Sequence, residues 1–249
     1  MPCRMMSGPS GNATVLPTPR VRRLPRDDVL ASAAIPEVGA VAMALRAWVV
    51  GMGSMLLMLA AFGAGARELK VLVMGDSLSA AYGLRAEQGW VALADRKSDR
   101  YAFHNASISG ETTSGGRTRI AAQLARVRPD IVVIELGAND GLRGLPLTQM
   151  GGNLGWMIGA SRATGARVLL AGLQLPPNFG RYAIDFRRSY ELISQRLGTG
   201  LIPHFLAPLG TERKWFQADN LHPVAAAQPM LADQVLQALD ALPARTATP

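Results

Sequence analysis

From residue 69 onward, short apolar segments alternate with longer segments that suit helices, and this alternation constrains the fold most strongly. Residues 131–134 are apolar at every position, which is typical of a strand buried on both faces. Five such β-α units in series favour a parallel sheet between helices, a three-layer α/β/α sandwich. The expected strands are 70–74, 101–106, 131–136, 167–173 and 201–206, and the expected helices are 89–97, 115–127, 147–164, 184–197 and about 224–242.

The first 66 residues differ from this pattern. Residues 1–42 are rich in Pro, Ser, Gly and Arg and show no periodicity, so they are interpreted as an unstructured extension or as a mispredicted start. Residues 43–66 combine a short basic start, an apolar run and an Ala-Gly-Ala end, and they predict a signal peptide that is cleaved after Ala66. About 18 apolar residues can also just span a bilayer, so an uncleaved anchor is the alternative. Glycines in the run and the Ala-Gly-Ala end favour cleavage.

Residues 67–249 are therefore expected to form one domain, periplasmic or secreted, with no stable insertion in the membrane after cleavage. The formal charge of the whole chain is +8, but its arginines are spread along the chain without a basic block, so no nucleic-acid partner is expected. Cys3, the only cysteine, precedes this domain. The domain should thus contain no disulfide, no thiolate nucleophile and no cysteine metal site.

Known nucleotide and metal motifs are absent from the sequence. There is no Walker A motif, no G-x-G-x-x-G after the first expected strand and no H-E-x-x-H. The G-x-S-x-G nucleophile elbow of the α/β-hydrolases is also absent. We therefore expect neither a cofactor nor a metal ion.

Three residue types used in nucleophilic hydrolysis follow expected strands. Ser77 comes directly after the first strand, and Asp219 and His222 lie three residues apart in a late loop. A serine hydroxyl is a weak nucleophile, so it needs a base, and the base needs a group that fixes its tautomer. The D-x-x-H spacing lets one loop supply both. A serine or aspartate after a strand is also a common helix N-cap, which is the alternative for the Ser77 segment.

Two further loops offer donors for an anionic intermediate. Gly110 follows the second strand, where its N–H can approach a ligand closely, and Asn139 follows the third, with a side-chain NH₂. An ordinary turn glycine and an Asx-turn are the alternatives. The remaining histidines, His104 and His204, are expected to be packed or surface residues.

Together these segments resemble the four sequence blocks of the SGNH, or GDSL, hydrolase superfamily. Within it, the chain is most similar to the bacterial periplasmic thioesterase I / lysophospholipase / arylesterase family, and the similarity extends over essentially all of residues 69–242. The matching segments are 75–78 (GDSL), 105–111 (NASISGE), 135–144 (ELGANDGLRG), 175–180 (LPPNFG) and 219–223 (DNLHP).

The resemblance implies a flavodoxin-like five-stranded sandwich and a role for each matched residue. Ser77 would be the nucleophile, His222 the base and Asp219 its orienting group. The main-chain N–H groups of Ser77 and Gly110 and the side chain of Asn139 would form the oxyanion hole. The family pattern has a glycine where this chain has Ala138, which touches no catalytic group.

The implied activity is hydrolysis of carboxylic esters and thioesters of acyl chains, which are small molecules, without a cofactor. The protein is expected to be a monomer. Leu142 lies between Gly141 and Gly144, and it is expected to cover the acyl chain in a segment that moves. Pro177 belongs to a Pro-Pro pair where relatives often have one proline, and it is expected at the rim of the substrate cleft. Two alternatives remain, a carbohydrate O-deacetylase of the same superfamily and a non-catalytic binding module.

Overall fold

The computed structural model describes residues 67–243 of the 249-residue chain. The predicted extension and signal peptide, 1–42 and 43–66, lie outside the described residues. Within the described part, no helix has both the length and the apolar character needed to cross a membrane.

A five-stranded sheet forms the middle layer, with strand order β2-β1-β3-β4-β5 and every neighbouring pair parallel. Its central strands are buried on both faces: residues 71–74 and 131–134 have no exposed surface. The predicted parallel sheet is therefore confirmed. The strands are β1 (Leu69–Gly75), β2 (Tyr101–Asn105), β3 (Ile131–Glu135), β4 (Arg167–Ala171) and β5 (Gly200–Ile202).

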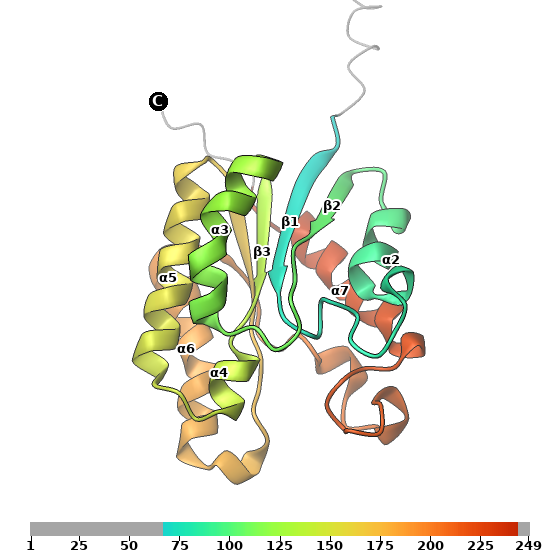
Figure 1. Cartoon of the computed structure of the whole chain (residues 1–249), viewed down its shortest axis with the longest axis vertical. Helices are drawn as coiled ribbons and strands as arrows, with labels where there is room; N and C mark the ends of the chain where they lie inside the picture. Colours follow the sequence, from blue (N-terminus) through green and yellow to red (C-terminus); the bar gives the residue numbers. More distant parts are fainter. Residues whose placement is uncertain (1–66, 244–249) are drawn as a thin grey trace, which may run out of the picture. The chain divides into compact units, whose positions relative to one another are not determined.

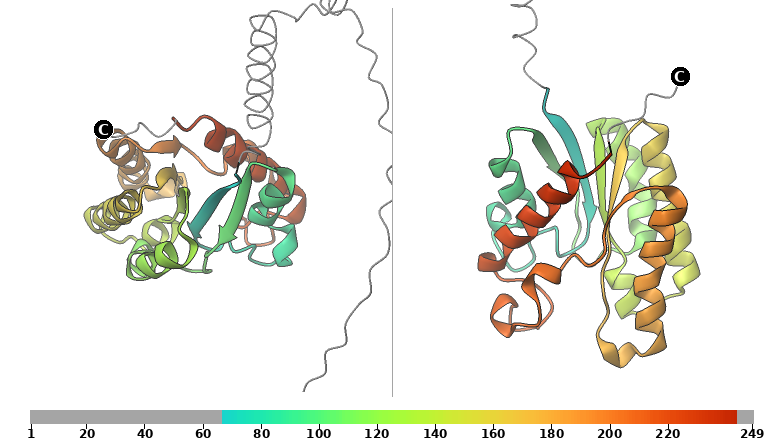
Figure 2. Two further views of the ribbon diagram at one scale, coloured as in Figure 1. Left: turned by 90° about the horizontal axis from the view of Figure 1, so that it is seen from above. Right: turned by 180° about the vertical axis from the view of Figure 1, so that it is seen from behind.

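Helices cover both faces of the sheet, as the views in Figures 1 and 2 show. On one face α2 packs against α7, and on the other α5 packs between α3 and α6. The predicted three-layer α/β/α sandwich is thus confirmed. The helices are α2 (Trp90–Lys97), α3 (Thr113–Val127), α4 (Ala138–Leu142), α5 (Leu147–Ala163), α6 (Arg181–Leu197) and α7 (Gln228–Asp240).

Besides shifts of a few residues at element ends, two differences from the sequence-based expectation stand out. β5 ends at Ile202 rather than near residue 206, because the chain then turns at Pro203, which has no N–H for a sheet ladder. The short helix α4 was not expected, since its segment ANDGL is too short for any helical periodicity. Contacts with α3 hold this helix in place: Asp140 is buried and accepts hydrogen bonds from the N–H of Thr113 at 2.8 Å and from the hydroxyl of Thr113 at 2.6 Å.

The strand order places a crevice beside β1. The chain leaves β1 toward β2 on one side and later returns to β3 on the other, which makes a topological switch point. In parallel α/β sheets ligands bind outside the carboxyl ends of the strands at such a point. The loops after β1, β2 and β3 meet there, and these loops contain Ser77, Gly110 and Asn139.

Candidate active site

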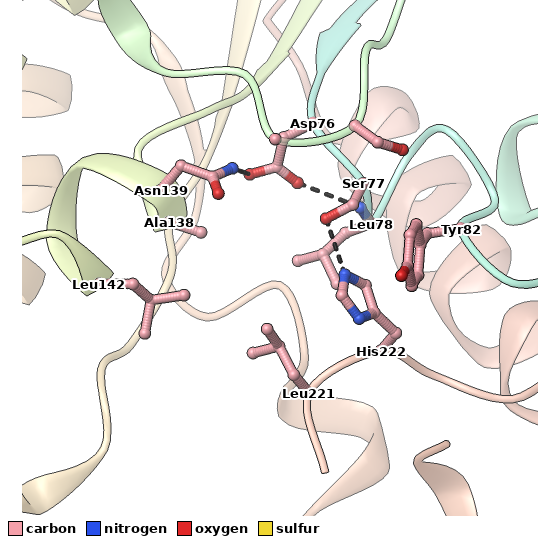
Figure 3. A pocket seen from close by; sticks show the side chains of 11 residues that line it. Asp76, Ser77, Leu78, Tyr82, Ala138, Asn139, Leu142, Leu221 and His222 are labelled. Carbon is pink, nitrogen blue, oxygen red and sulfur yellow. Dashed lines mark hydrogen bonds between the residues drawn. The ribbon is translucent and has the colours of Figure 1, made fainter. Parts of the chain in front are cut away.

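A cavity of about 230 Å³ opens at this crevice (Figure 3). It brings together residues from four loops that are as much as 146 positions apart in the sequence. Most of its walls are apolar, with the polar groups gathered around Ser77. The lining residues are Asp76, Ser77, Leu78, Tyr82, Ser109, Gly110, Ala138, Asn139, Leu142, Leu221 and His222.

Ser77, His222 and Asp219 form a continuous chain of hydrogen bonds. The Nε2 atom of His222 lies 2.8 Å from the Ser77 hydroxyl, and its Nδ1 atom lies 2.7 Å from Oδ2 of Asp219. Nδ1–H donates to that carboxylate in the tautomer that leaves Nε2 free to accept the serine proton. The hydrogen bond from His222 lowers the pKa of Asp219 to about 2, so this carboxylate is charged across the working range of most enzymes.

The loop that contains Asp219 is folded around its own carboxylate. Oδ1 of Asp219 accepts hydrogen bonds from the N–H of Leu221 at 2.9 Å and from the N–H of His222 at 3.0 Å. The turn needs a left-handed residue at position 220, and Asn220 takes it with φ 59°. The short spacing of aspartate and histidine therefore gives a rigid unit in which both side chains are fixed together.

Tyr82 and Gln217 connect this loop to the Ser77 segment. The ring of Tyr82 lies against the His222 imidazole with centroids 4.3 Å apart. The Gln217 side chain donates to the carbonyl of Tyr82 at 2.8 Å, and its own N–H donates to the carbonyl of His222 at 2.8 Å. Sequence reasoning missed Tyr82, because no local pattern predicts that a tyrosine in a turn will meet a histidine 140 positions later.

The main-chain N–H groups of Ser77 and Gly110 lie at the cavity and have no protein acceptor within residues 67–243. Gly110 has φ +79°, a left-handed conformation in which L side chains are strained. Asn139 lies beside them but already uses its amide: Nδ2 donates to Oδ2 of Asp76 at 3.1 Å and to the carbonyl of Glu111 at 2.9 Å. The three predicted oxyanion donors are thus at one site, with Asn139 held by two partners.

A buried pair of acids lies behind these donors. Asp76 is almost fully buried and accepts a hydrogen bond from the N–H of Leu78 at 3.1 Å, which stiffens the turn. Burial raises the pKa of Asp76 to about 6, although hydrogen bonds and His222 act against this. Burial, and next the charge of Asp76, raise the pKa of Glu135 well above its usual range.

Only one of the two predicted substrate-binding residues lines the cavity. Leu142 lines the cavity and is 36% exposed, opposite Leu221, which is 39% exposed (Figure 3). Pro177 is exposed and does not line this cavity, because the loop after β4 forms a separate short helix, Pro177–Phe179. Sequence reasoning missed Leu221, which is an exposed leucine between the predicted orienting group and base.

The segment after Asn139 is more firmly held than its two glycines suggested. A Cβ atom on Gly141 would lie 2.7 Å from the Phe186 ring and 2.8 Å from Leu175, so this glycine serves close packing. The N–H of Leu145 donates to the carbonyl of Asp140 at 2.9 Å, which closes the turn. Leu142 forms a wall of the cavity, and the expected movement of this segment when an acyl chain binds stays a prediction.

His104 and His204 do not line the cavity. His204 is partly buried, and this burial lowers its pKa. Across residues 67–243 no group of three or more His, Cys, Asp or Glu side chains is arranged to hold a metal ion.

Known proteins resemble this chain at the levels of family, sequence and structure. The model of the GDSL-like Lipase/Acylhydrolase family matches residues 73–228. Esterase TesA from Pseudomonas aeruginosa is 48% identical over 196 residues, which cover 76% of this chain and 96% of that protein. Thioesterase 1/protease 1/lysophospholipase L1 from Escherichia coli K12 is 36% identical over 190 residues, which cover 76% of this chain and 91% of that protein.

Solved structures agree with this result. The crystal structure of TesA has a TM-score of 0.65 at 48% identity and covers 68% of this chain and 97% of that one. The psychrotrophic esterase EstA from Pseudoalteromonas sp., inhibited by monoethylphosphonate, has a TM-score of 0.67 at 40% identity. The match covers 70% of this chain and 97% of that one. The chain therefore belongs to the GDSL-like lipase/acylhydrolase family of SGNH hydrolases and is an ester-hydrolysing enzyme.

Proposed function

We propose that the protein is a serine esterase that hydrolyses carboxylic esters and thioesters of acyl chains through an acyl-enzyme. The observation that carries this proposal is the unbroken chain of hydrogen bonds from Asp219 through His222 to Ser77. It ends in a cavity where the main-chain N–H groups of Ser77 and Gly110 are free. Relatives named esterase, arylesterase and thioesterase/lysophospholipase support the same substrate class.

In the first half of the reaction, His222 accepts the Ser77 proton while Oγ attacks the acyl carbonyl carbon. The resulting oxyanion is stabilised by the N–H groups of Ser77 and Gly110 and by the amide of Asn139. Since that amide already has two partners, it reaches the oxyanion by sharing or exchanging its longer contact, the one to Asp76. Each donor of this kind typically lowers the barrier by roughly 3 kcal/mol.

His222 then protonates the leaving alcohol or thiol, and the acyl group stays on Ser77. A water molecule repeats the sequence against this ester, with His222 again as base. Asp219 keeps the imidazole in one tautomer and stabilises its cationic form in both halves. No cofactor is required for these steps.

The character of the cavity favours an acyl substrate over a sugar acetate. Leu78, Leu142, Leu221 and Tyr82 contribute apolar walls, whereas a carbohydrate site needs several polar groups to fix the hydroxyls. Its volume of about 230 Å³ lies below the roughly 300–1,000 Å³ of typical ligand pockets, so a long acyl chain would extend beyond it.

We further propose that the enzyme acts as a monomer in the periplasm or outside the cell. The proposed location rests on the signal peptide predicted for residues 43–66. Cell fractionation tests the location, and size-exclusion chromatography with light scattering tests the monomer.

The decisive experiment for the activity compares the purified protein with its Ser77→Ala variant on p-nitrophenyl butyrate. The variant should fold normally and lose at least about 10³-fold in kcat, because members of such a triad act as a unit. A fluorophosphonate probe should label the unchanged protein at Ser77 alone. Labelling at another residue, or near-normal turnover by Ser77→Ala, would overturn the assignment.

A further inference from the structure

The loop between β2 and α3, residues 106–112, presents Gly110 to the cavity. Its first half continues alongside β1: the N–H of Ala106 donates to the carbonyl of Val73 at 2.9 Å, and that of Ile108 donates to Gly75 at 3.0 Å. Its second half is a turn closed by the N–H of Glu111 and the carbonyl of Ile108 at 3.2 Å. One weak turn hydrogen bond leaves the direction of the Gly110 N–H to be set by other contacts.

Arg119 of α3 joins the two ends of this loop. Its Nε lies 2.9 Å from Oε1 and 2.7 Å from Oε2 of Glu111, and Nη2 also contacts that carboxylate. Its Nη1 donates to the carbonyl of Ala106 at 2.5 Å. The side chains are 18% exposed for Arg119 and 8% exposed for Glu111, so solvent screens the pair little. A Cβ atom on Gly115 would lie 2.8 Å from the Glu111 carboxylate, so this glycine leaves room for it.

Glu111 also contacts the other half of the predicted oxyanion hole. Its main-chain carbonyl accepts the hydrogen bond from Asn139 Nδ2 at 2.9 Å. The carbonyl of the preceding residue, Gly110, accepts from Arg143, which follows α4, at 3.1 Å. The side chain of Glu111 is thus fixed by Arg119, while its main chain fixes Asn139 and adjoins the Gly110 N–H.

We propose that Arg119 and Glu111 are positioning residues for the oxyanion hole, and that their ion pair sets the direction of the Gly110 N–H and the Asn139 amide together. This inference rests on the proposed function of those two donors. Removing charges from water costs free energy, so a mostly buried ion pair is weak evidence for a purely stabilising role. Its contacts with both ends of the loop instead suit the fixing of geometry.

The test measures kcat, KM and thermal stability for Arg119→Met, Arg119→Lys, Glu111→Gln and the double variant Arg119→Met/Glu111→Gln on p-nitrophenyl butyrate. Arg119→Met should lower kcat by about 10- to 100-fold, because small misplacements of catalytic groups cost up to about 10²-fold. KM should change by less than about twofold, since the donors act on charge that develops in the transition state. Arg119→Lys should recover only part of the loss, because an ammonium group cannot contact both Glu111 and Ala106 in the same geometry.

The double variant leaves neither charge buried without its partner, so it keeps the test valid if a single variant folds poorly. Its kcat should match that of the more damaged single variant, because both changes break the same ion pair. If the fold losses in kcat of the two single variants instead multiply in the double variant, the shared role is refuted. Arg100→Met removes an ion pair with Asp240 at the opposite end of the sheet and should leave kcat unchanged.

Asn139→Ala, measured in parallel, separates the two proposals. If Asn139→Ala keeps its kcat, the proposed oxyanion hole itself is wrong. If Asn139→Ala loses kcat while the folded Arg119 and Glu111 variants keep theirs, only the positioning role is overturned. A lower melting temperature with unchanged kcat would likewise show that the pair is merely structural.

Discussion

Two leucines on facing walls of the cavity should set how strongly the enzyme prefers longer acyl chains. Leu142 follows the predicted oxyanion asparagine and Leu221 precedes the predicted base, and both line the cavity around Ser77 (Figure 3). They are 36% and 39% exposed, so part of each side chain remains for a substrate to cover. A decanoyl chain can cover this surface, whereas a butyryl chain ends close to the carbonyl.

The expected contribution of each leucine to binding of a long acyl chain follows from its exposed fraction. Full burial of a leucine side chain contributes about 1.5–3 kcal/mol, and only about a third of each side chain remains to be covered. Each leucine should therefore contribute about 0.5–1 kcal/mol to binding of a long chain, or about 2- to 5-fold in kcat/KM. The two sites lie on separate walls, so the double Leu142→Ala/Leu221→Ala variant should lose about 5- to 30-fold on a decanoyl ester.

The assay compares kcat/KM for p-nitrophenyl butyrate and p-nitrophenyl decanoate, below the concentration at which the longer ester aggregates. Leu192→Ala is the matched control, because Leu192 is 52% exposed on α6 and does not line the cavity. Loss confined to the decanoyl ester in the cavity variants supports the argument. An equal loss on both esters, no loss, or the same loss in Leu192→Ala would refute it.

Three further results are expected. Asn139→Ala should lower kcat by roughly 10²- to 10³-fold with little change in KM, and a change in KM alone would make Asn139 a ground-state binding residue. Burial raises the pKa of Asp76 to about 6, so its charge destabilises the fold above that pH and the penalty fades as the pH falls toward 4. Urea unfolding measures the difference in free energy of unfolding between Asp76→Asn and the unchanged protein. This difference should shift by about 2–3 kcal/mol in favour of the variant when the pH rises from about 4 to about 8, and a pH-independent difference would contradict this. Expression from Met43 should yield a product that begins at Arg67, which N-terminal sequencing checks, and a membrane-retained product that keeps Trp48 would favour an uncleaved anchor.

The sequence by itself determined the layers of the fold and the loops that meet at the site. Continuous apolar runs such as 131–134 indicate strands buried on both faces, and this requires helices on each side. Ser77, Asp219 and His222 could be selected because spacing along the chain and position after a strand are local properties. The D-x-x-H unit is itself local, since its loop folds around the Asp219 carboxylate.

Only the tertiary structure decided which side chains meet across those loops. Tyr82 lies against His222, Arg119 holds Glu111 and Asp76 holds Asn139, yet no periodicity relates the members of these pairs. The structure also excluded Pro177 from the cavity. The physical reason is that periodicity reports which face of an element is buried, whereas contacts between loops depend on strand order and on how the helices pack against the sheet.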